Sequence, residues 1–180
     1  MPDQKILIGV TGGVAAYKTA FLTSRLAQAG YQVQVMMTAA AQKFVGPATF
    51  AALSGRGVAS EVFDERFPLG AHIELARDYD LMLVAPASAD FLAKAAHGLA
   101  DDLLSTTYLC FTGPVLVAPT MNVEMWNQPS VQRNIETLRN DGVQIIEPGS
   151  GWLSCRVEGK GRMVEPDDLF TAVESALDGN

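Results

Sequence analysis

The chain has 180 residues, of which 48% are hydrophobic and 18% are charged, and its formal net charge is −7 at pH 7. An acidic chain lacks the lysine and arginine face that binds a phosphate backbone, so we expect no nucleic-acid partner. The longest apolar stretches are far shorter than the roughly 20 residues that cross a bilayer, and the start lacks a secretory signal pattern, so we expect a cytoplasmic protein without membrane spans.

The first half of the chain alternates apolar runs with helical spacing. Residues 5–11 predict a strand that ends at a glycine turn, and residues 14–29 predict the helix that follows it. Further predicted elements are a strand at 31–38, a helix at 39–54 interrupted at Gly46 and Pro47, and a short strand at 58–63.

The second half continues the alternation. Predicted elements are a strand at 79–86, a helix from Ser88, a strand at 114–119, a helix at 130–140, a strand at 143–148 and a closing helix at 166–177. Apolar strands separated by helices indicate a parallel sheet covered on both faces. The sequence therefore predicts an α/β fold with one doubly wound parallel sheet of about six strands.

One domain over residues 1–180 is expected, because this length suits a single core and no repeat divides the chain. The high apolar share leaves surface for subunit contacts, which favours a homo-oligomer. Cys110 and Cys155 are too few for a disulfide framework and have no metal-binding spacing, so we predict free thiols and no metal site. We interpret Cys110 as a small core residue and His97 as part of a helix end.

Small and hydroxyl residues follow several predicted strands, at the sheet edge where α/β proteins bind ligands. Gly12 and Gly13 form a strand-to-helix turn whose backbone N–H groups suit an anion such as phosphate. The turn matches neither the dinucleotide fingerprint nor a P-loop, which disfavours NAD and ATP. The hydroxyls of Thr38 and Ser88 could hold a single terminal phosphate, as in FMN.

Asn122 follows the apolar strand at 114–119 at the same edge. An amide offers two donors and an acceptor without a charge, which suits a substrate carboxylate that must leave as CO2. The alternative on local sequence is a helix-capping asparagine.

The motifs at residues 12–18, 71–75, 85–90, 100–106 and 119–126 resemble those of the homo-oligomeric flavin-containing cysteine decarboxylases. Within that family they are most similar to the bacterial phosphopantothenoylcysteine decarboxylases of coenzyme A biosynthesis. The resemblance implies a flavodoxin-like (Rossmann-like) domain that binds FMN. The residues that it assigns to the cofactor are Gly12, Gly13, Val14, Ala15, Thr38, Phe44, Ser88, Ala89, Asp90, Ser105 and Thr106.

The resemblance also implies the reaction. The flavin oxidises the substrate thiol to a thioaldehyde, CO2 leaves, and the resulting ene-thiol is reduced again without NAD. His72, which we place in a loop or a short helix before the strand at 79–86, is a structural histidine on local sequence alone. The resemblance makes it the expected base, since its ordinary pKa is about 6.5. Asn122 is expected to hold the carboxylate, and Cys155 to protonate the ene-thiol.

Residues 149–163 form a glycine-rich connection that contains Cys155, and the resemblance implies that it is a substrate clamp. We hypothesise that Lys160 or Arg162 binds the substrate phosphate. Met121, Asn122 and Met125 are further expected substrate-binding residues. Many relatives have glycine where this chain has Arg156, which leaves the clamp geometry and the substrate open.

Three alternative functions remain. A peptidyl-cysteine decarboxylase would share the flavin and His72 but would not need a final reduction by Cys155. A flavin prenyltransferase would share the phosphate site without the motif at 119–126. A non-catalytic flavin-binding regulatory subunit is disfavoured because residues 176–180 carry no acidic tail. Expected assembly is a trimer or dodecamer, with a fused or separate phosphopantothenate–cysteine ligase as a possible partner.

Overall fold

Five parallel strands form the central sheet of the computed structural model, which describes residues 3–179. They are β1 (Lys5–Val10), β2 (Gln32–Met37), β3 (Leu81–Ala87), β4 (Val115–Pro119) and β5 (Gln144–Ile145). Their order is β2-β1-β3-β4-β5, as in flavodoxin-like folds, which confirms the predicted fold class. The strand order reverses between β1 and β3, and ligands of such sheets bind at that point on the carboxyl side.

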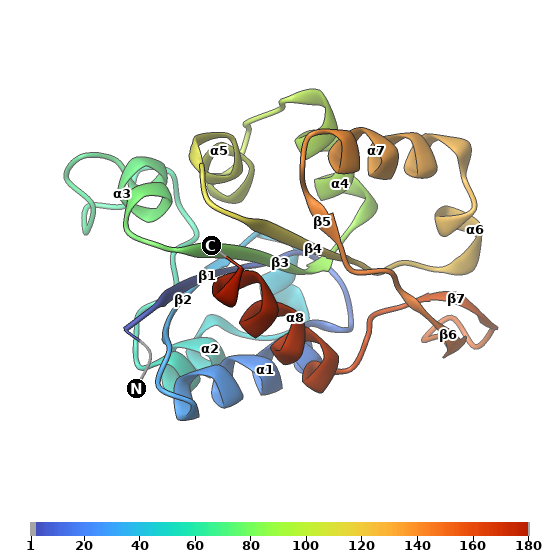
Figure 1. Cartoon of the computed structure of the whole chain (residues 1–180), viewed down its shortest axis with the longest axis horizontal. Helices are drawn as coiled ribbons and strands as arrows, with labels where there is room; N and C mark the ends of the chain where they lie inside the picture. Colours follow the sequence, from blue (N-terminus) through green and yellow to red (C-terminus); the bar gives the residue numbers. More distant parts are fainter. Residues whose placement is uncertain (1–2, 180) are drawn as a thin grey trace.

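Helices cover both faces of the sheet (Figure 1). One face carries α1 (Ala16–Gln28), α2 (Pro47–Ser54) and α8 (Pro166–Asp178). The other carries α3 (Ala71–Arg77), α4 (Ala89–His97), α5 (Leu103–Cys110) and α7 (Pro129–Asn140). A 3-10 turn, η1 (Ala41–Lys43), precedes α2, and the short α6 (Val123–Trp126) follows β4. None of the helices within residues 3–179 is both long and apolar enough to cross a membrane.

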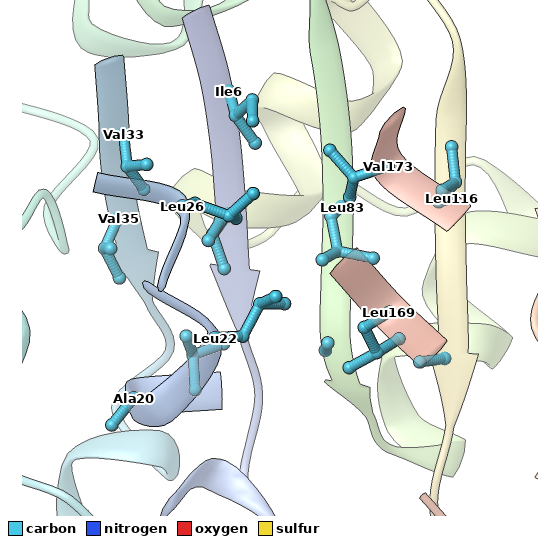
Figure 2. Packing of buried hydrophobic residues seen from close by; sticks show 14 of the residues in the cluster. Ile6, Ala20, Leu22, Leu26, Val33, Val35, Leu83, Leu116, Leu169 and Val173 are labelled. Carbon is cyan, nitrogen blue, oxygen red and sulfur yellow. The ribbon is translucent and has the colours of Figure 1, made fainter. Parts of the chain in front are cut away.

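The core on the α1 and α8 side shows why these helices form where they do. Leu22 and Leu26 of α1 and Leu169 and Val173 of α8 lie against apolar side chains of four strands (Figure 2). All four helix residues have 0% exposure, and each buried side chain of this size contributes about 1.5–3 kcal/mol. The strand residues that they meet are Ile6, Val33, Val35, Leu83 and Leu116.

Two predicted strands differ from the structure. The predicted strand at 58–63 is wrong: only Ala59 makes an isolated bridge, to Met36 of β2. The chain then leaves the sheet, and Phe63 is 95% exposed. The predicted strand at 143–148 contains only the two residues of β5. The sheet therefore has five strands instead of six.

Several elements were not predicted as such. The sequence predicted neither α5 nor α6, and it left open a loop or a short helix where α3 forms. The interpretation of Cys110 as a core residue is wrong, because it is exposed in the last turn of α5 and the chain returns to the core only at Phe111. His97 ends α4, as expected, and Gly98 caps it with a positive φ of 67°.

The glycine-rich connection is an ordered hairpin of β6 (Gly149–Trp152) and β7 (Glu158–Arg162), which pair antiparallel. Its turn is closed by Leu153 N–H donating to Val157 O and by Arg156 N–H donating to Leu153 O, each at 2.9 Å. Arg156 has a φ of 65°, a left-handed conformation that favours glycine. Cys155 therefore lies in a tight turn at the tip of the hairpin.

Candidate active site

The turn after β1 is fastened to the end of β3. Thr11 Oγ1 donates to Pro86 O at 2.6 Å and accepts from Ser88 N–H at 2.8 Å, so one hydroxyl joins two strand ends. A Cβ on Gly12 would lie 2.7 Å from the Cβ of Ala40, so this position needs glycine for close approach. Gly13 is not constrained in this way, because its added Cβ would meet Pro86 only at 3.5 Å.

A cavity of about 460 Å³ lies beside this turn, between the ends of β1, β2 and β3. Thr38 and Ser88 line it, and each hydroxyl accepts from a backbone N–H, of Ala41 at 3.2 Å and Phe91 at 3.3 Å respectively. Among residues 3–179 neither hydroxyl donates a hydrogen bond, so both O–H groups can donate to an anion.

The cations near this cavity are already paired. Lys94 lies 2.8 Å from Asp101, 3.1 Å from Asp102 and 3.3 Å from Asp90. The hydrogen bond with Asp101 outweighs burial and, together with Asp102 and Asp90, raises the pKa of the Lys94 ammonium above its ordinary value. An anion bound here therefore depends on neutral donors, namely hydroxyls and backbone N–H groups.

Asp102 caps α5, and this cap uses two residues that the resemblance assigns to the cofactor. Asp102 accepts from Ser105 N–H at 2.8 Å, and Thr106 Oγ1 donates to Asp102 O at 2.7 Å. Ser105 has 0% exposure and its hydroxyl also donates to Asp102. Burial opposes ionisation of Asp102, but the bonds from Ser105 and Lys94 hold its pKa below the usual value. Ser105 and Thr106 do not line the cavity, and neither does Phe44, which is 54% exposed.

A second cavity of about 510 Å³ joins the glycine turn to the hairpin. Its lining includes Gly12, Gly13, Val14, Ala15, Ser88, Ala89, Met121, Asn122, Met125, Cys155 and Arg162, all predicted site residues. Asp90 lines the smaller cavity instead. The structure thus brings together most of the predicted cofactor residues, the predicted amide and the predicted thiol.

Asn122 caps a helix, which is one of the two functions that the sequence allows, and its position leaves the ligand-binding function open. As N-cap of α6 its Oδ1 accepts from Met125 N–H at 2.8 Å, which fixes the side chain. The amide NH2 group is not used by this cap and can donate to a ligand in the cavity.

The β7 strand lies directly against the Asn122 segment. Met121 N–H donates to Gly161 O at 3.1 Å. A Cβ on Gly161, whose φ is 135°, would overlap the Met121 carbonyl oxygen, and a Cβ on Gly159 would lie 2.9 Å from Val123. These glycines allow the backbone contact that places the hairpin over the cavity.

Two further predicted site residues, besides Phe44, Ser105 and Thr106, line neither cavity. Lys160 does not line the larger cavity: its Nζ lies 2.7 Å from Glu147 and 5.1 Å above the Trp126 ring. His72 lies in α3, and in Figure 1 α3 and the hairpin are at opposite ends of the molecule. Its Nδ1 is buried and has no hydrogen-bond partner among residues 3–179.

The fold and these cavities define an α/β protein that binds a small ligand at the carboxyl edge of its sheet. The Flavoprotein family model matches residues 1–178, and the chain belongs to this family.

Comparison with individual proteins gives more detail. The chain is 47% identical over 173 residues to the Coenzyme A biosynthesis bifunctional protein CoaBC of Bacillus subtilis (strain 168), covering 96% of this chain and 43% of that protein. It thus spans less than half the length of the curated relatives that it matches.

Solved structures are also similar. The FMN-dependent cysteine decarboxylase SpaF superposes with a TM-score of 0.85 at 35% identity, covering 98% of this chain and 96% of SpaF. A cysteine variant of PPC decarboxylase complexed with pantothenoylaminoethenethiol has a TM-score of 0.89 at 28% identity, covering 97% of this chain and 98% of that one.

Proposed function

We propose that this chain, loaded with FMN, decarboxylates phosphopantothenoylcysteine to phosphopantetheine in coenzyme A biosynthesis. The observation that carries this proposal is the single cavity that brings the Asn122 amide and the Cys155 thiol to the glycine turn. The similar proteins support it: the Bacillus subtilis relative is named for coenzyme A biosynthesis, and the PPC decarboxylase variant holds an ene-thiol.

The crevice at β1 and β3 fits FMN. The O–H groups of Thr38 and Ser88 and the amino ends of α1 and α4 offer neutral donors for its phosphate. The neighbouring cavity, about 510 Å³, has the size typical of small-molecule sites. FMN supplies a reversible two-electron oxidation of the thiol-bearing carbon, which provides the electron sink that an unactivated carboxylate lacks.

The residues of the chain supply binding and protons. The Asn122 amide holds the substrate carboxylate without a positive charge. A positive charge would stabilise the carboxylate and so oppose the loss of CO2. Arg162 and Lys18 both line the cavity. The Lys18 side chain is only 5% exposed, whereas that of Arg162 is 45% exposed, so Arg162 is the cation that can bind the substrate phosphate. Lys160 lies outside the lining of the cavity. Cys155 in the hairpin turn donates the proton that the ene-thiol carbon needs in the final reduction.

We infer that His72 completes this site from a second copy of the chain. Within one chain α3 is remote from the hairpin (Figure 1), so His72 cannot act on a substrate held by Asn122 and Cys155. The segment before α3 carries exposed apolar side chains, Phe63 at 95% and Leu69 at 67%, which suit a subunit contact. A trimer or a dodecamer in the cytoplasm meets this requirement.

The bifunctional name of the relatives, together with the part of their length that this chain does not match, supports a partner activity. We propose that it is a phosphopantothenate–cysteine ligase, fused or separate, because such an enzyme supplies the substrate.

The second candidate is decarboxylation of another cysteine derivative, such as the carboxyl-terminal cysteine of a peptide. The 35% identity to SpaF, an FMN-dependent cysteine decarboxylase, favours keeping it. The two candidates differ in the phosphate, which only the first substrate carries.

Single-enzyme turnover of phosphopantothenoylcysteine by the flavin-loaded protein, followed by mass spectrometry, tests the function. We expect a product lighter by CO2, accumulation of the ene-thiol with Cys155→Ser, and no product with His72→Asn. Cys110→Ser and His97→Asn are matched controls and should behave as the wild type, since neither residue lines either of the two cavities described above. Absence of product from the wild type would instead favour a peptide substrate or a non-catalytic subunit.

Mixed oligomers test the origin of His72. If the base comes from a second copy, co-assembled His72→Asn and Cys155→Ser chains recover activity in about a quarter of their sites. A site is intact when the chain that supplies His72 is a Cys155→Ser chain and the chain that supplies Cys155 is a His72→Asn chain. If both residues act from one chain, every site lacks one of them. Activity that stays at the level of the separate variants would then refute the shared site.

A further inference from the structure

A buried lysine connects α1 to the base of the β6–β7 hairpin. The Lys18 side chain is only 5% exposed, and burying an ammonium is unfavourable unless the group is paired. Its Nζ donates to Met163 O at 2.8 Å and to Glu165 Oε1 at 2.9 Å. The ammonium therefore joins the helix that follows the glycine turn to the chain directly after β7.

Glu165 binds a second cation with the same oxygen. Arg162, the last residue of β7, donates from Nη2 to Glu165 Oε1 at 2.7 Å. Glu165 is the N-cap of α8, yet its side chain makes no capping hydrogen bond, so the carboxylate serves the two cations. The hydrogen bond from Lys18, followed by the charges of Lys18 and Arg162, holds the pKa of Glu165 below its ordinary value.

Arg162 is confined on its other side by β6. A Cβ on Gly151 would lie 3.4 Å from Arg162 Nη1, so the guanidinium has little free space there. Arg162 also lines the larger cavity. A guanidinium held in this way loses little side-chain entropy when it binds an anion.

We propose that Lys18 and Glu165 are positioning residues, which hold the Arg162 guanidinium ready for the substrate phosphate and fasten β7 to α1. The inference rests on the proposed function for the identity of the substrate. Lys18 also lines the larger cavity, but its side chain is only 5% exposed and its ammonium is bonded to Met163 O and Glu165, so we assign it to positioning and not to the chemical step. Glu165 lies outside the lining of that cavity.

The variant Glu165→Gln separates positioning from charge. Loss of the carboxylate makes the cavity more positive, which by itself strengthens phosphate binding and lowers KM. The same loss frees Arg162, which weakens binding and raises KM. Positioning and charge therefore predict opposite signs.

Glu147 provides a matched control. Glu147 accepts a hydrogen bond at 2.7 Å from Lys160, which lies on β7 as Arg162 does. Glu147→Gln therefore also removes a carboxylate from a β7 cation. Glu147 and Lys160 lie outside the lining of the larger cavity. The two variants thus change the charge equally. Glu165→Gln releases Lys18 and Arg162, which line the larger cavity, whereas Glu147→Gln releases Arg139 and Lys160, which do not.

Steady-state kinetics of the flavin-loaded oligomer, with phosphopantothenoylcysteine as substrate, give the first readout. We expect KM to rise about tenfold in Glu165→Gln and in Lys18→Met, with kcat changed less than about twofold. Glu165→Asp should recover part of the loss, and Glu147→Gln should match the wild type. A KM for Glu165→Gln equal to or below the wild-type value would overturn the proposal.

Hydrogen–deuterium exchange of residues 149–163 gives a readout that needs no substrate. Exchange should be about tenfold faster in Glu165→Gln and Lys18→Met than in the wild type and Glu147→Gln. Equal exchange in all four proteins would overturn the anchoring of β7. If the four proteins show this exchange pattern but the wild type does not turn over phosphopantothenoylcysteine, the proposed function is refuted and the positioning of Arg162 still holds.

Discussion

Gly161→Ala should open the hairpin without unfolding the sheet. Gly161 has a φ of 135°, and its added Cβ would overlap the Met121 carbonyl oxygen. The backbone conformation costs a residue with a side chain about 1–3 kcal/mol. Overpacking costs about 1–3 kcal/mol more, and a backbone oxygen cannot rotate away as a side chain could. The closed hairpin therefore loses about 2–6 kcal/mol relative to an open one.

The lower end of this range already changes the closed-to-open ratio about thirtyfold, since each 1.4 kcal/mol is about a factor of ten. Hydrogen–deuterium exchange measures this ratio directly when reclosing is fast, so amides of residues 149–163 should exchange at least about thirtyfold faster. The value of kcat/KM should fall as well, because Cys155 and Arg162 reach the cavity only from the hairpin.

Gly149→Ala is the control on the facing strand. Its added Cβ would lie 3.9 Å from Arg162 O, an ordinary contact. The expected change is within about 0.5 kcal/mol. If Gly161→Ala exchanged and turned over like Gly149→Ala, the contact between β7 and Met121 would not determine hairpin closure.

Arg162→Ala should raise KM for a phosphorylated substrate about tenfold, and Lys160→Ala should change it less than about twofold, because Arg162 lines the larger cavity and Lys160 does not. Equal effects of the two variants would contradict this assignment. Asp102→Asn should lower the melting temperature near neutral pH. The folded-state pKa of Asp102 is below its unfolded value, so its stabilisation exists above the unfolded pKa of about 3.9 and is lost as the pH falls through the folded pKa; a difference that persists in strong acid would refute the reasoning. Arg156→Gly should slow exchange in the hairpin turn severalfold, since a side chain at a φ of 65° costs about 1 kcal/mol; faster exchange would show that Arg156 itself holds the turn.

Periodicity predicted the sheet because its strands are buried on both faces. It failed at 58–63, where a β-branched and aromatic run has the composition of a strand but only Ala59 reaches β2. Pairing with the sheet edge, and not composition, decides whether such a run becomes a strand. Four strand ends meet by topology, so Gly12, Ser88 and Asn122 could be placed together from the sequence.

Residues that depend on distant partners could not be predicted in the same way. Lys18 lies on the apolar stripe of α1 with Leu22 and Leu26, which was the available signal, but its partner Glu165 is the N-cap of α8, far along the chain. The hydroxyl of Thr11 was missed because a strand-end threonine has no local mark of its two bonds. The hairpin was read as a loop, since glycines hide the pairing of β6 with β7.

The anchored and exposed parts of the hairpin suggest how the site admits substrate. The β7 strand is fixed through Gly161 to Met121 and through Arg162 to Glu165 and Lys18, whereas Trp152 on β6 is 64% exposed and Cys155 at the tip is exposed too. We therefore expect any motion that opens the cavity to occur at the tip, while Arg162 and Asn122 keep their places. On this reasoning, variants of the tip should change the final protonation, and variants of the β7 contacts should change substrate binding.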